Sequence, residues 1–417
     1  MNNILEDPRP IQDGGSFDVI VVGGGISGIS ASVASARAGA NVLLLEKNIL
    51  LGGLATVGLI SWYEPLCDGE GRKMTSGIAE ELIRLAVRYG PNNLAEIWQA
   101  DEKLSEKRCA GASRGQKSDR DRREHRRYAS FFSPTIFALA LNEYIEKNNV
   151  KLLLDVLAAY PVMEGNTCRG VVVQAKEGRI FFAGKVVVDT TGDASVLHAG
   201  KVPTIDGKNF LSYVSHVTTS EELKELANGE DLLGLRRWQW EGYTLANGGH
   251  PEKVPLYAGV TSSEITDYVR IGQRMLFEKV KMEPVGSFDI LTLPAMAQMR
   301  TCRRLDGAYT FRGDDERKFE DAIGACGDFR VRGPKWQIPY RALYHPDFPN
   351  LLAAGRIISA EGEGWEVTRV IPVCALTGQA AGTAAAIAVA EKCGVQQVDI
   401  RRLQMLLSQD GVTLDWE

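Results

Sequence analysis

A run of glycines directly after an apolar strand constrains this chain more than any other feature of its sequence. Residues 17–22 form a β-branched run that predicts a buried parallel strand, and Gly23 ends it. Small residues from 27 to 38 favour a helix that ends at Gly39, and residues 41–46 predict a second buried strand. This order predicts one βαβ unit near the start of the fold.

The glycines fit the pattern G-x-G-x-x-G, and their place between strand and helix gives each one a physical role. We expect Gly23 to make the tight turn, Gly25 to let the backbone approach a pyrophosphate, and Gly28 to let the helix lie against the strand. Ser27 opens the helix, whose N-terminal N–H groups attract phosphates. Glu46 follows Gly28 by 18 residues, where a carboxylate binds ribose hydroxyls and repels a 2′-phosphate. The pattern predicts a dinucleotide site that disfavours NADP; the alternative is a glycine-rich turn that binds nothing.

A second glycine pair, Gly52 and Gly53, follows Glu46 closely and leads to Thr56. An NAD dehydrogenase does not require close backbone approach at this point of the fold, whereas a longer cofactor such as FAD would use it. The pair therefore favours FAD over NAD.

Composition and charge narrow the class of protein. The 417 residues are 44% hydrophobic and 24% charged, which predicts a globular protein of roughly two to three domains. The net charge of −5 gives the chain no overall attraction to nucleic acid or anionic lipid. We expect a cytoplasmic protein, because no signal-peptide pattern and no apolar tract of membrane-spanning length is found. The seven cysteines include no C-x-x-C pair and no zinc-type spacing, so no metal site is expected.

Further segments organise the rest of the chain into two domains. Charged residues between 101 and 127 predict a surface excursion, which we extend to residues 66–127. We expect a discontinuous α/β domain from residues 1–65, 128–200 and 346–417, with an α+β substrate or cap domain inserted at 201–345. The predicted strands are 150–158, 168–175, 179–183, 185–189 and 350–354, and the predicted helices are 135–148, 221–227, 263–281, 372–392 and 398–411.

Several segments carry a family resemblance in a fixed order along the chain. They are residues 18–28 with Glu46 and Lys47, residues 52–56, residues 188–194 with a D-T-T-G-D-A motif, residues 299–307 with an R-x-x-R-R-x-x-G stretch, and the blocks 337–341, 350–356, 368–372 and 378–382. With these motifs the chain resembles a large, mostly uncharacterised bacterial family of FAD-dependent oxidoreductases within the fumarate reductase/succinate dehydrogenase-like flavoprotein superfamily.

The resemblance implies a Rossmann-like FAD-binding domain (GR2-type) that holds FAD non-covalently. It implies that Glu46 binds the adenosine ribose and that the Gly52–Gly53 pair follows the diphosphate and ribityl chain. It also implies that a late helix points its positive N-terminus at the flavin pyrimidine, which stabilises an anionic reduced ring. The cofactor-binding residues expected in this way are Gly23, Gly25, Ser27, Gly28, Glu46, Lys47, Gly52, Gly53, Thr56, Leu157, Gly192, Asp193, Gly355, Arg356, Val370 and Ile371.

Four arginines in the family-like segments are candidates for holding a substrate. A flavin takes hydride at N5, so the protein must hold a substrate C–H over the ring. A guanidinium binds a carboxylate through two parallel bonds, which makes arginine the best clamp for an acid. The candidates are Arg300, Arg303, Arg304 and Arg369, and the alternative for each is a structural ion pair.

The proton carrier is less well defined by the sequence. His216 and His345 are candidates, since imidazole titrates near neutral pH, and the alternative is an ordinary hydrogen-bonded histidine. Many relatives carry a histidine shortly after the segment that here ends at Ala360, whereas this chain has Glu361 and Glu363. Either glutamate is a candidate replacement base; the alternative is a solvated loop. The expected catalytic set is Arg300, Arg303, Arg369, Glu361 and His216.

These features predict an FAD-dependent oxidoreductase that transfers hydride between flavin N5 and a small polar metabolite: a hydroxy acid, an unsaturated acid or a sugar derivative. Two alternatives stay open: a flavoprotein that modifies RNA through the basic segment 120–127, and a binding module with a structural FAD. No cysteine pair or second glycine motif predicts a disulfide reductase or an NAD(P)H domain. We expect a small-molecule partner and neither membrane nor nucleic acid; the electron partner and self-association stay open.

Overall fold

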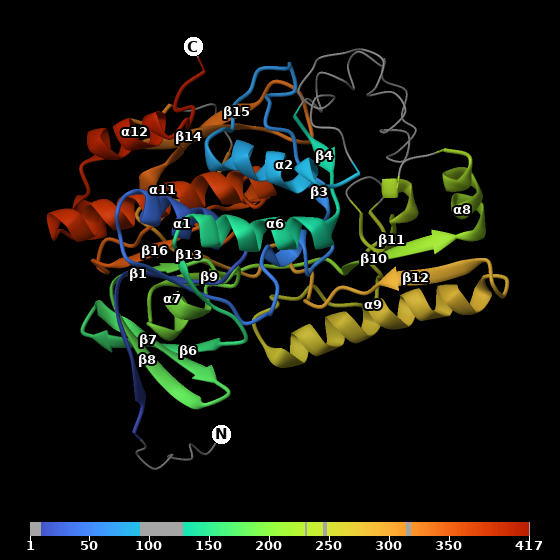
Figure 1. Cartoon of the computed structure of the whole chain (residues 1–417), viewed down its shortest axis with the longest axis horizontal. Helices are drawn as coiled ribbons and strands as arrows, with labels where there is room; N and C mark the ends of the chain where they lie inside the picture. Colours follow the sequence, from blue (N-terminus) through green and yellow to red (C-terminus); the bar gives the residue numbers. More distant parts are fainter. Residues whose placement is uncertain (1–9, 92–127, 230–231, 245–247, 314–317, 417) are drawn as a thin grey trace.

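The computed structural model describes residues 10–91, 128–229, 232–244, 248–313 and 318–416 (Figure 1). Its core is a seven-stranded sheet in the order β5-β2-β1-β8-β7-β6, with β16 paired to β8. Strands β5, β2, β1, β8 and β16 are parallel, and β7 and β6 extend the sheet as antiparallel strands. This is the expected α/β fold with a parallel core. The strands are β1 (Gln12–Val22), β2 (Val42–Leu45), β5 (Lys151–Leu153), β6 (Leu157–Glu164), β7 (Thr167–Ala175), β8 (Gly178–Asp189) and β16 (Leu351–Ala353).

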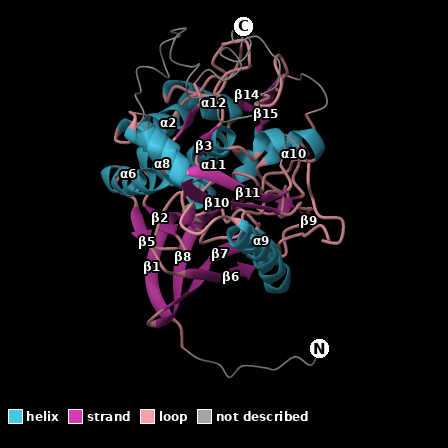
Figure 2. Cartoon of the chain, turned by 90° about the vertical axis from the view of Figure 1, so that its right-hand side faces the viewer, coloured by secondary structure: helices cyan, strands magenta, loops and turns pink. Residues whose placement is uncertain are grey.

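The alternating side chains of β1 enter two separate cores, as a strand buried on both faces requires. Val19 and Val21 join the core under the helices, whereas Ile20 and Val22 join the core between the sheet and α7 (Ser195–Ala199). Figures 1 and 2 show the helices together on one side of the sheet. They are α1 (Ile26–Arg37), α2 (Ile78–Arg88), α6 (Pro134–Lys147) and α11 (Ile371–Glu391).

Helix α11 is the central core helix of the fold. Its 21 residues are long and apolar enough to span a bilayer, but 83% of the most apolar window is buried inside the molecule. Small residues let it lie directly on α1, where the Ser35 hydroxyl donates to the Gly382 carbonyl at 2.9 Å. Burial in this core therefore accounts for the apolar sequence of α11.

A second, smaller sheet lies to the right of the core in Figure 1. Its order is β11-β10-β12, and all its pairs are antiparallel. The long helix α9 (Ser262–Met282) packs against it, because Gly272 leaves room for the ring of Tyr213; a Cβ on Gly272 would lie 2.5 Å from that ring. The elements of this part are β10 (Ser212–Thr219), α8 (Ser220–Ala227), η2 (Leu232–Leu235), β11 (Arg237–Gly242) and β12 (Phe288–Thr292).

Short elements connect these two parts and cover the helices. They are η1 (Gly53–Ala55), β3 (Trp62–Tyr63), β4 (Ser130–Phe131), β9 (Thr204–Asp206), β13 (Arg303–Leu305), β14 (Ala322–Gly327), β15 (Lys335–Pro339), η3 (Tyr340–Ala342), α10 (Gly362–Thr368), η4 (Val395–Gln397) and α12 (Ile400–Gln409). Strands β3 and β4, β9 and β13, and β14 and β15 form three two-stranded sheets.

The structure differs from the sequence-based expectation in four places. Residues 66–91 are not a surface excursion, because α2 is buried against α11, whereas the excursion expected over 92–127 lies outside the described residues. Residue 311 and residues within 323–344 contribute side chains to the core under the helices rather than to the smaller sheet. The strand expected over 150–158 is interrupted where Asp155 adopts a φ of 59°. The strands expected at 179–183 and 185–189 are one strand, β8.

Candidate cofactor and substrate site

The first glycine loop has the shape that its sequence predicts. Gly23 has a φ of 109°, and a Cβ on it would lie 2.6 Å from the Thr190 carbonyl oxygen. A Cβ on Gly28 would lie 1.7 Å from the Gly23 carbonyl oxygen, so the start of α1 touches the turn. In contrast, a Cβ on Gly25 would meet nothing within 4 Å. The loop is therefore tight at its two ends and open at Gly25, the position expected to face a pyrophosphate.

The second glycine pair lies beside the first loop. The Gly52 N–H donates to the Gly24 carbonyl at 2.8 Å, and a Cβ on Gly53 would lie 3.2 Å from the Gly25 Cα. Helix α1 starts after Gly25 without a side-chain cap, so its first N–H groups are available to an anion. Thr56, at the end of this segment, donates its hydroxyl to the Leu51 carbonyl at 2.5 Å. Two glycine segments thus form one backbone cradle that fits a diphosphate.

Glu46 lies at the edge of this cradle, directly after β2. Its side chain is only 6% exposed. One carboxylate oxygen accepts from the Gly24 N–H at 2.5 Å, and the other accepts from the backbone N–H and the side-chain amide of Asn48 at 2.7 and 2.8 Å. Neighbouring Lys47 is exposed. Leu157 approaches Glu46 through the backbone, because the Val156 N–H donates to the Glu46 carbonyl at 3.1 Å.

Arg356 joins three of the segments expected at the cofactor. Its guanidinium donates to the Gly192 carbonyl at 2.6 Å and to the Met299 carbonyl at 2.7 Å. Gly355 has a φ of 79°, and a Cβ on it would lie 2.5 Å from the Ser27 hydroxyl. Asp193 accepts from the Ser195 N–H at 3.2 Å. Arg356 therefore fixes the positions of the Gly192 turn and the residue 299 segment relative to α1.

The N-terminus of α11 carries a carboxylate that the sequence did not single out. The Ile371 N–H donates to Glu64 at 3.2 Å, across 307 positions of sequence. Burial raises the pKa of Glu64 to about 7, although the Ile371 N–H and the charge of Arg369 oppose the shift. Val370, the N-cap residue, contributes no side-chain bond. The first N–H of α11 is therefore occupied by Glu64, and the roles expected for Val370 and Ile371 at the cofactor stay predictions.

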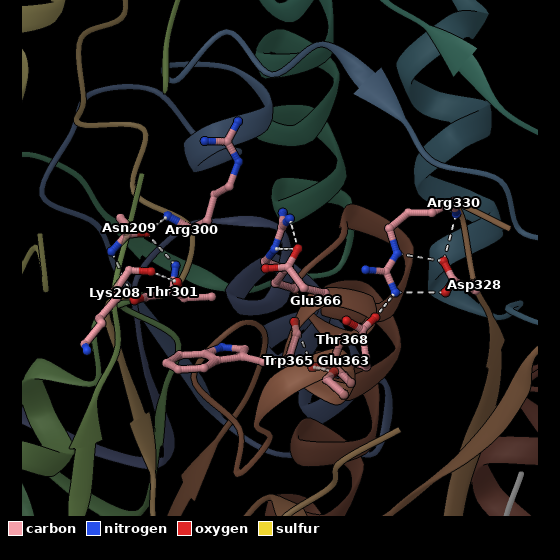
Figure 3. Close-up of polar contacts among 12 residues, drawn as sticks. Lys208, Asn209, Arg300, Thr301, Asp328, Arg330, Glu363, Trp365, Glu366 and Thr368 are labelled. Atoms are coloured by element: carbon pink, nitrogen blue, oxygen red, sulfur yellow. Dashed lines mark hydrogen bonds and ion pairs between the residues drawn. The ribbon is translucent and has the colours of Figure 1, made fainter. Parts of the chain in front are cut away.

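Among the candidate arginines, Arg300 is the one whose guanidinium is most available to a substrate. Asn209 accepts from the Arg300 and Thr301 N–H groups at 2.6 and 2.8 Å, which fixes the backbone. Figure 3 shows the Arg300 side chain extending away from these contacts. Within the described ranges, its guanidinium makes no hydrogen bond and no ion pair. Burial and the charge of Arg369 both lower its pKa.

Most of the other candidate charges form ion pairs with protein residues. Arg303, which is 8% exposed, donates to Asp206 at 2.7 Å across the β9–β13 sheet. Glu361 accepts from Arg304 at 3.0 Å and from Arg312 at 2.6 Å. Arg369 pairs with Glu366, one helical turn before it. Glu363 pairs with Arg330, which also binds Asp328 (Figure 3). These pairs favour the structural alternative for Arg303, Arg304 and Glu361.

His216 lies on β10, where the smaller sheet meets the cofactor loop. Its Nε2 accepts from the Trp238 indole N–H at 3.2 Å and lies 3.4 Å from the Ser61 hydroxyl. Burial and the charge of Arg236 lower its pKa to about 4, so the ring is neutral near pH 7. Because an indole donates only, Nε2 carries no hydrogen. His345 lies elsewhere, beside Phe348.

Comparisons with known proteins agree with this geometry. The sequence model of the FAD dependent oxidoreductase family matches residues 18–253 and 239–407. The tRNA uridine 5-carboxymethylaminomethyl modification enzyme MnmG of Listeria welshimeri is 28% identical over 216 residues, 51% of this chain and 30% of that protein. Glycerol-3-phosphate dehydrogenase 1 of Mycobacterium bovis is 37% identical over 84 residues, 20% of this chain and 15% of that protein. The chain thus spans less than a third of the length of either relative.

Among solved structures, p-nitrophenol 4-monooxygenase PnpA from Pseudomonas putida superposes with a TM-score of 0.49 at 13% identity, over 95% of this chain and 88% of that one. The family match covers nearly the whole described chain, including both glycine segments and the α11 region. The cradle, the carboxylate of Glu46 and the uncapped N-terminus of α1 fit FAD. The chain therefore belongs to the FAD dependent oxidoreductase family, and FAD is its cofactor.

Proposed function

We propose that this enzyme oxidises or reduces a small metabolite that carries a carboxylate, a hydroxy acid or an unsaturated acid, and that Arg300 binds that carboxylate. The guanidinium of Arg300 supports this proposal because it is positioned by Asn209 and has no acceptor among the described residues. Arg300 is partly buried; a partly buried cation without a partner is costly for a protein, and an anionic ligand would offset that cost. The charge of Arg369 also acts on Arg300, but it is offset by Glu366, with which Arg369 forms an ion pair.

Bound FAD supplies hydride exchange at N5, and the chain's own residues hold the substrate. For a hydroxy acid, the Cα–H bond breaks with transfer of its electron pair and hydrogen as hydride, while the hydroxyl proton leaves to a base or to water. Arg300 would orient the acid through two parallel hydrogen bonds and so fix which C–H approaches the ring. Arg369 is already paired with Glu366, so Arg300 is the residue proposed to bind the acid.

The test is anaerobic titration of the FAD-loaded enzyme with hydroxy acids, unsaturated acids and neutral sugars, read by flavin absorbance between about 300 and 550 nm. We expect acids to perturb or bleach the flavin spectrum and matched neutral alcohols to leave it unchanged. Arg300→Met should weaken acid binding about 100-fold, as loss of a charge-assisted bidentate contact costs about 2–4 kcal/mol. A spectrum that responds equally to acids and to neutral sugars would overturn the carboxylate proposal.

Arg303→Met is the matched control, because Arg303 is an arginine on the same chain segment that is buried and pairs with Asp206. We expect it to lower thermal stability and leave acid affinity within about two-fold of wild type. If Arg303→Met weakened acid binding as strongly as Arg300→Met, the assignment of the clamp to Arg300 would be wrong.

A second candidate function is flavin-dependent modification of RNA. The match over 216 residues to a tRNA uridine modification enzyme favours it. The basic segment of this chain that would contact RNA, residues 120–127, lies outside the described residues. Retention of tRNA that weakens steeply between about 50 and 200 mM salt would support this function. No retention at low salt would exclude it.

A further inference from the structure

Four aromatic side chains form a continuous cluster where the smaller sheet meets the cofactor-binding part. Trp62 and Phe131 are opposite each other on β3 and β4, with ring centroids 4.6 Å apart. Phe131 lies 5.4 Å from Trp238, and Trp238 lies 5.4 Å from Trp240, both on β11. All four rings are partly exposed, whereas core aromatics such as Phe137 are fully buried. We call these four residues the aromatic cluster.

The aromatic cluster is adjacent to the cofactor loop. Ser61 follows Thr56 by five residues, and its hydroxyl accepts from the Trp238 indole at 3.1 Å. Gln298, which is 2% exposed, donates to the Gly58 carbonyl at 2.6 Å and to the Val214 carbonyl at 3.0 Å. The loop after Thr56 is therefore held directly against β10.

Arg300 belongs to the same junction. It follows Gln298 by two residues, and its charge acts on Tyr268. The Tyr268 hydroxyl donates to the Ser212 carbonyl at 2.5 Å, at the start of β10. Arg300 thus lies near the start of β10, and Trp238 and Trp240 of the aromatic cluster lie further along, opposite His216 and Val214 on one face of the β10–β11 pair.

Polar atoms on this face are buried without partners. The indole N–H of Trp240 and the hydroxyls of Ser212 and Thr218 have no hydrogen-bond partner among the described residues. Ser212 is 0% exposed and Thr218 6%. By the β10–β11 register, Trp240 lies opposite Val214, so it shares a face with Ser212 and His216. An unpaired buried donor is costly, and a ligand acceptor would satisfy it.

We propose that the aromatic cluster and Arg300 form one substrate site, and that the substrate is an aromatic or similarly planar conjugated carboxylic acid. The rings of Trp238 and Trp240 offer flat apolar surface, the Trp240 N–H offers a donor to a ring substituent, and Arg300 takes the acid. This inference rests on the proposed function, since it needs the same clamp. It also names the chemical class of the substrate portion that lies beyond the carboxylate. Hydride transfer alone does not define that class.

The test titrates FAD-loaded enzyme with two matched series of acids: phenylacetate, 4-phenylbutyrate and 6-phenylhexanoate against acetate, butyrate and hexanoate. Binding is read by quenching of tryptophan fluorescence and by the flavin spectrum. We expect the best aryl acid to bind at least 10-fold more tightly than the alkyl acid of equal chain length. Trp240→Leu should reduce aryl affinity about 10-fold or more and leave alkyl affinity unchanged. Equal affinity of the two series would overturn the proposal.

Two further variants keep the result interpretable. Trp240→Phe retains a ring and should hold phenyl acids within about three-fold, which separates loss of the aromatic surface from misfolding. Trp416→Phe removes a tryptophan that packs near Lys318 and Lys335, and should leave both series unchanged. If Arg300→Met left acid binding intact while aryl preference persisted, the clamp would be wrong and the aromatic site would stand. If Trp240→Leu weakened both series equally, the aromatic site would be wrong.

Discussion

Gly378 of α11 lies directly on the backbone of Ser27 in α1: a Cβ at position 378 would be 2.3 Å from the Ser27 carbonyl oxygen. One turn further on, a Cβ on Gly382 would be 2.1 Å from the Ala31 carbonyl oxygen. These two contacts fix the phosphate-facing end of α1 relative to the N-terminus of α11. The two helix ends that are expected at opposite parts of the cofactor are thus held together by glycine contacts.

Gly378→Ala should therefore separate the two helices and weaken both stability and FAD binding. Overpacking of this kind costs about 1–3 kcal/mol or more, because backbone cannot give way as a flexible side chain can. We expect a fall of several degrees in the melting temperature and partial loss of flavin on purification. Ala380→Gly, in the same buried helix, is the comparison that changes the helix without adding a methyl against α1. A Gly378→Ala protein with wild-type stability would show that α1 and α11 do not lie in this contact.

Two substitutions in the first glycine loop should separate the effect on FAD affinity from the effect on protein stability. Gly25 has a φ of −72° and open space before it, so Gly25→Ala should fold normally but lose FAD affinity about 100-fold, since the methyl enters the cradle. Gly28→Ala should destabilise the protein even without FAD, because its methyl would lie 1.7 Å from the Gly23 carbonyl oxygen. Melting curves and FAD titration of the apoprotein measure both. Normal FAD binding by Gly25→Ala would contradict the cradle.

The buried imidazole of His216 should make stability depend on pH on the acid side. Its pKa falls from 6.5 to about 4 on folding, so the unfolded chain binds more protons between these values. Stability therefore rises with pH from about 4 to 6.5 and is flat above. His216→Gln should reduce the difference in unfolding free energy between pH 5 and pH 7.5 by about 1–3 kcal/mol, measured by urea unfolding at both pH values. Identical pH profiles for the two proteins would argue against a buried neutral ring.

Glu64 should act in the opposite direction. Burial raises its pKa to about 7, above the ordinary value of 4.5, so the folded protein holds a proton that the unfolded chain releases. The contribution of Glu64 to the free energy of unfolding is fully present below about pH 4.5 and is lost as the pH rises through 7. Glu64→Gln keeps an acceptor for the Ile371 N–H and should raise the melting temperature at pH 8 while leaving it nearly unchanged at pH 5. A variant less stable than wild type at pH 8 would indicate that the charged carboxylate is stabilising.

The Rossmann unit could be predicted closely because its determinants are local. Strand β1, helix α1 and strand β2 start and end within a few residues of expectation, since glycine placement and apolar periodicity act within one turn or one strand. The expectation failed for α2, which was assigned to a charged surface excursion. Its amphipathic pattern is clear, but the face that buries Leu82 and Ile83 is supplied by α11 and α6, which are distant in sequence.

The candidate substrate site could be predicted only in part. Arg300, Arg303 and Arg369 were equivalent as sequence candidates, and the structure distinguishes them by partners. Asp206 lies 97 positions from Arg303, and nothing in local spacing predicts that pair. Glu64 and Ser61 were missed for the same reason: their partners, Ile371 and His216, are 307 and 155 positions away.

The cofactor, the backbone cradle and the family follow from local sequence, because a phosphate-binding turn is built from glycines that are neighbours along the chain. The tertiary structure alone decided which charged side chains are paired and which are free to bind a ligand. Ion pairing and burial depend on residues that approach only when the two sheets pack together, and the Arg300 guanidinium has no ion pair among the described residues because of that packing.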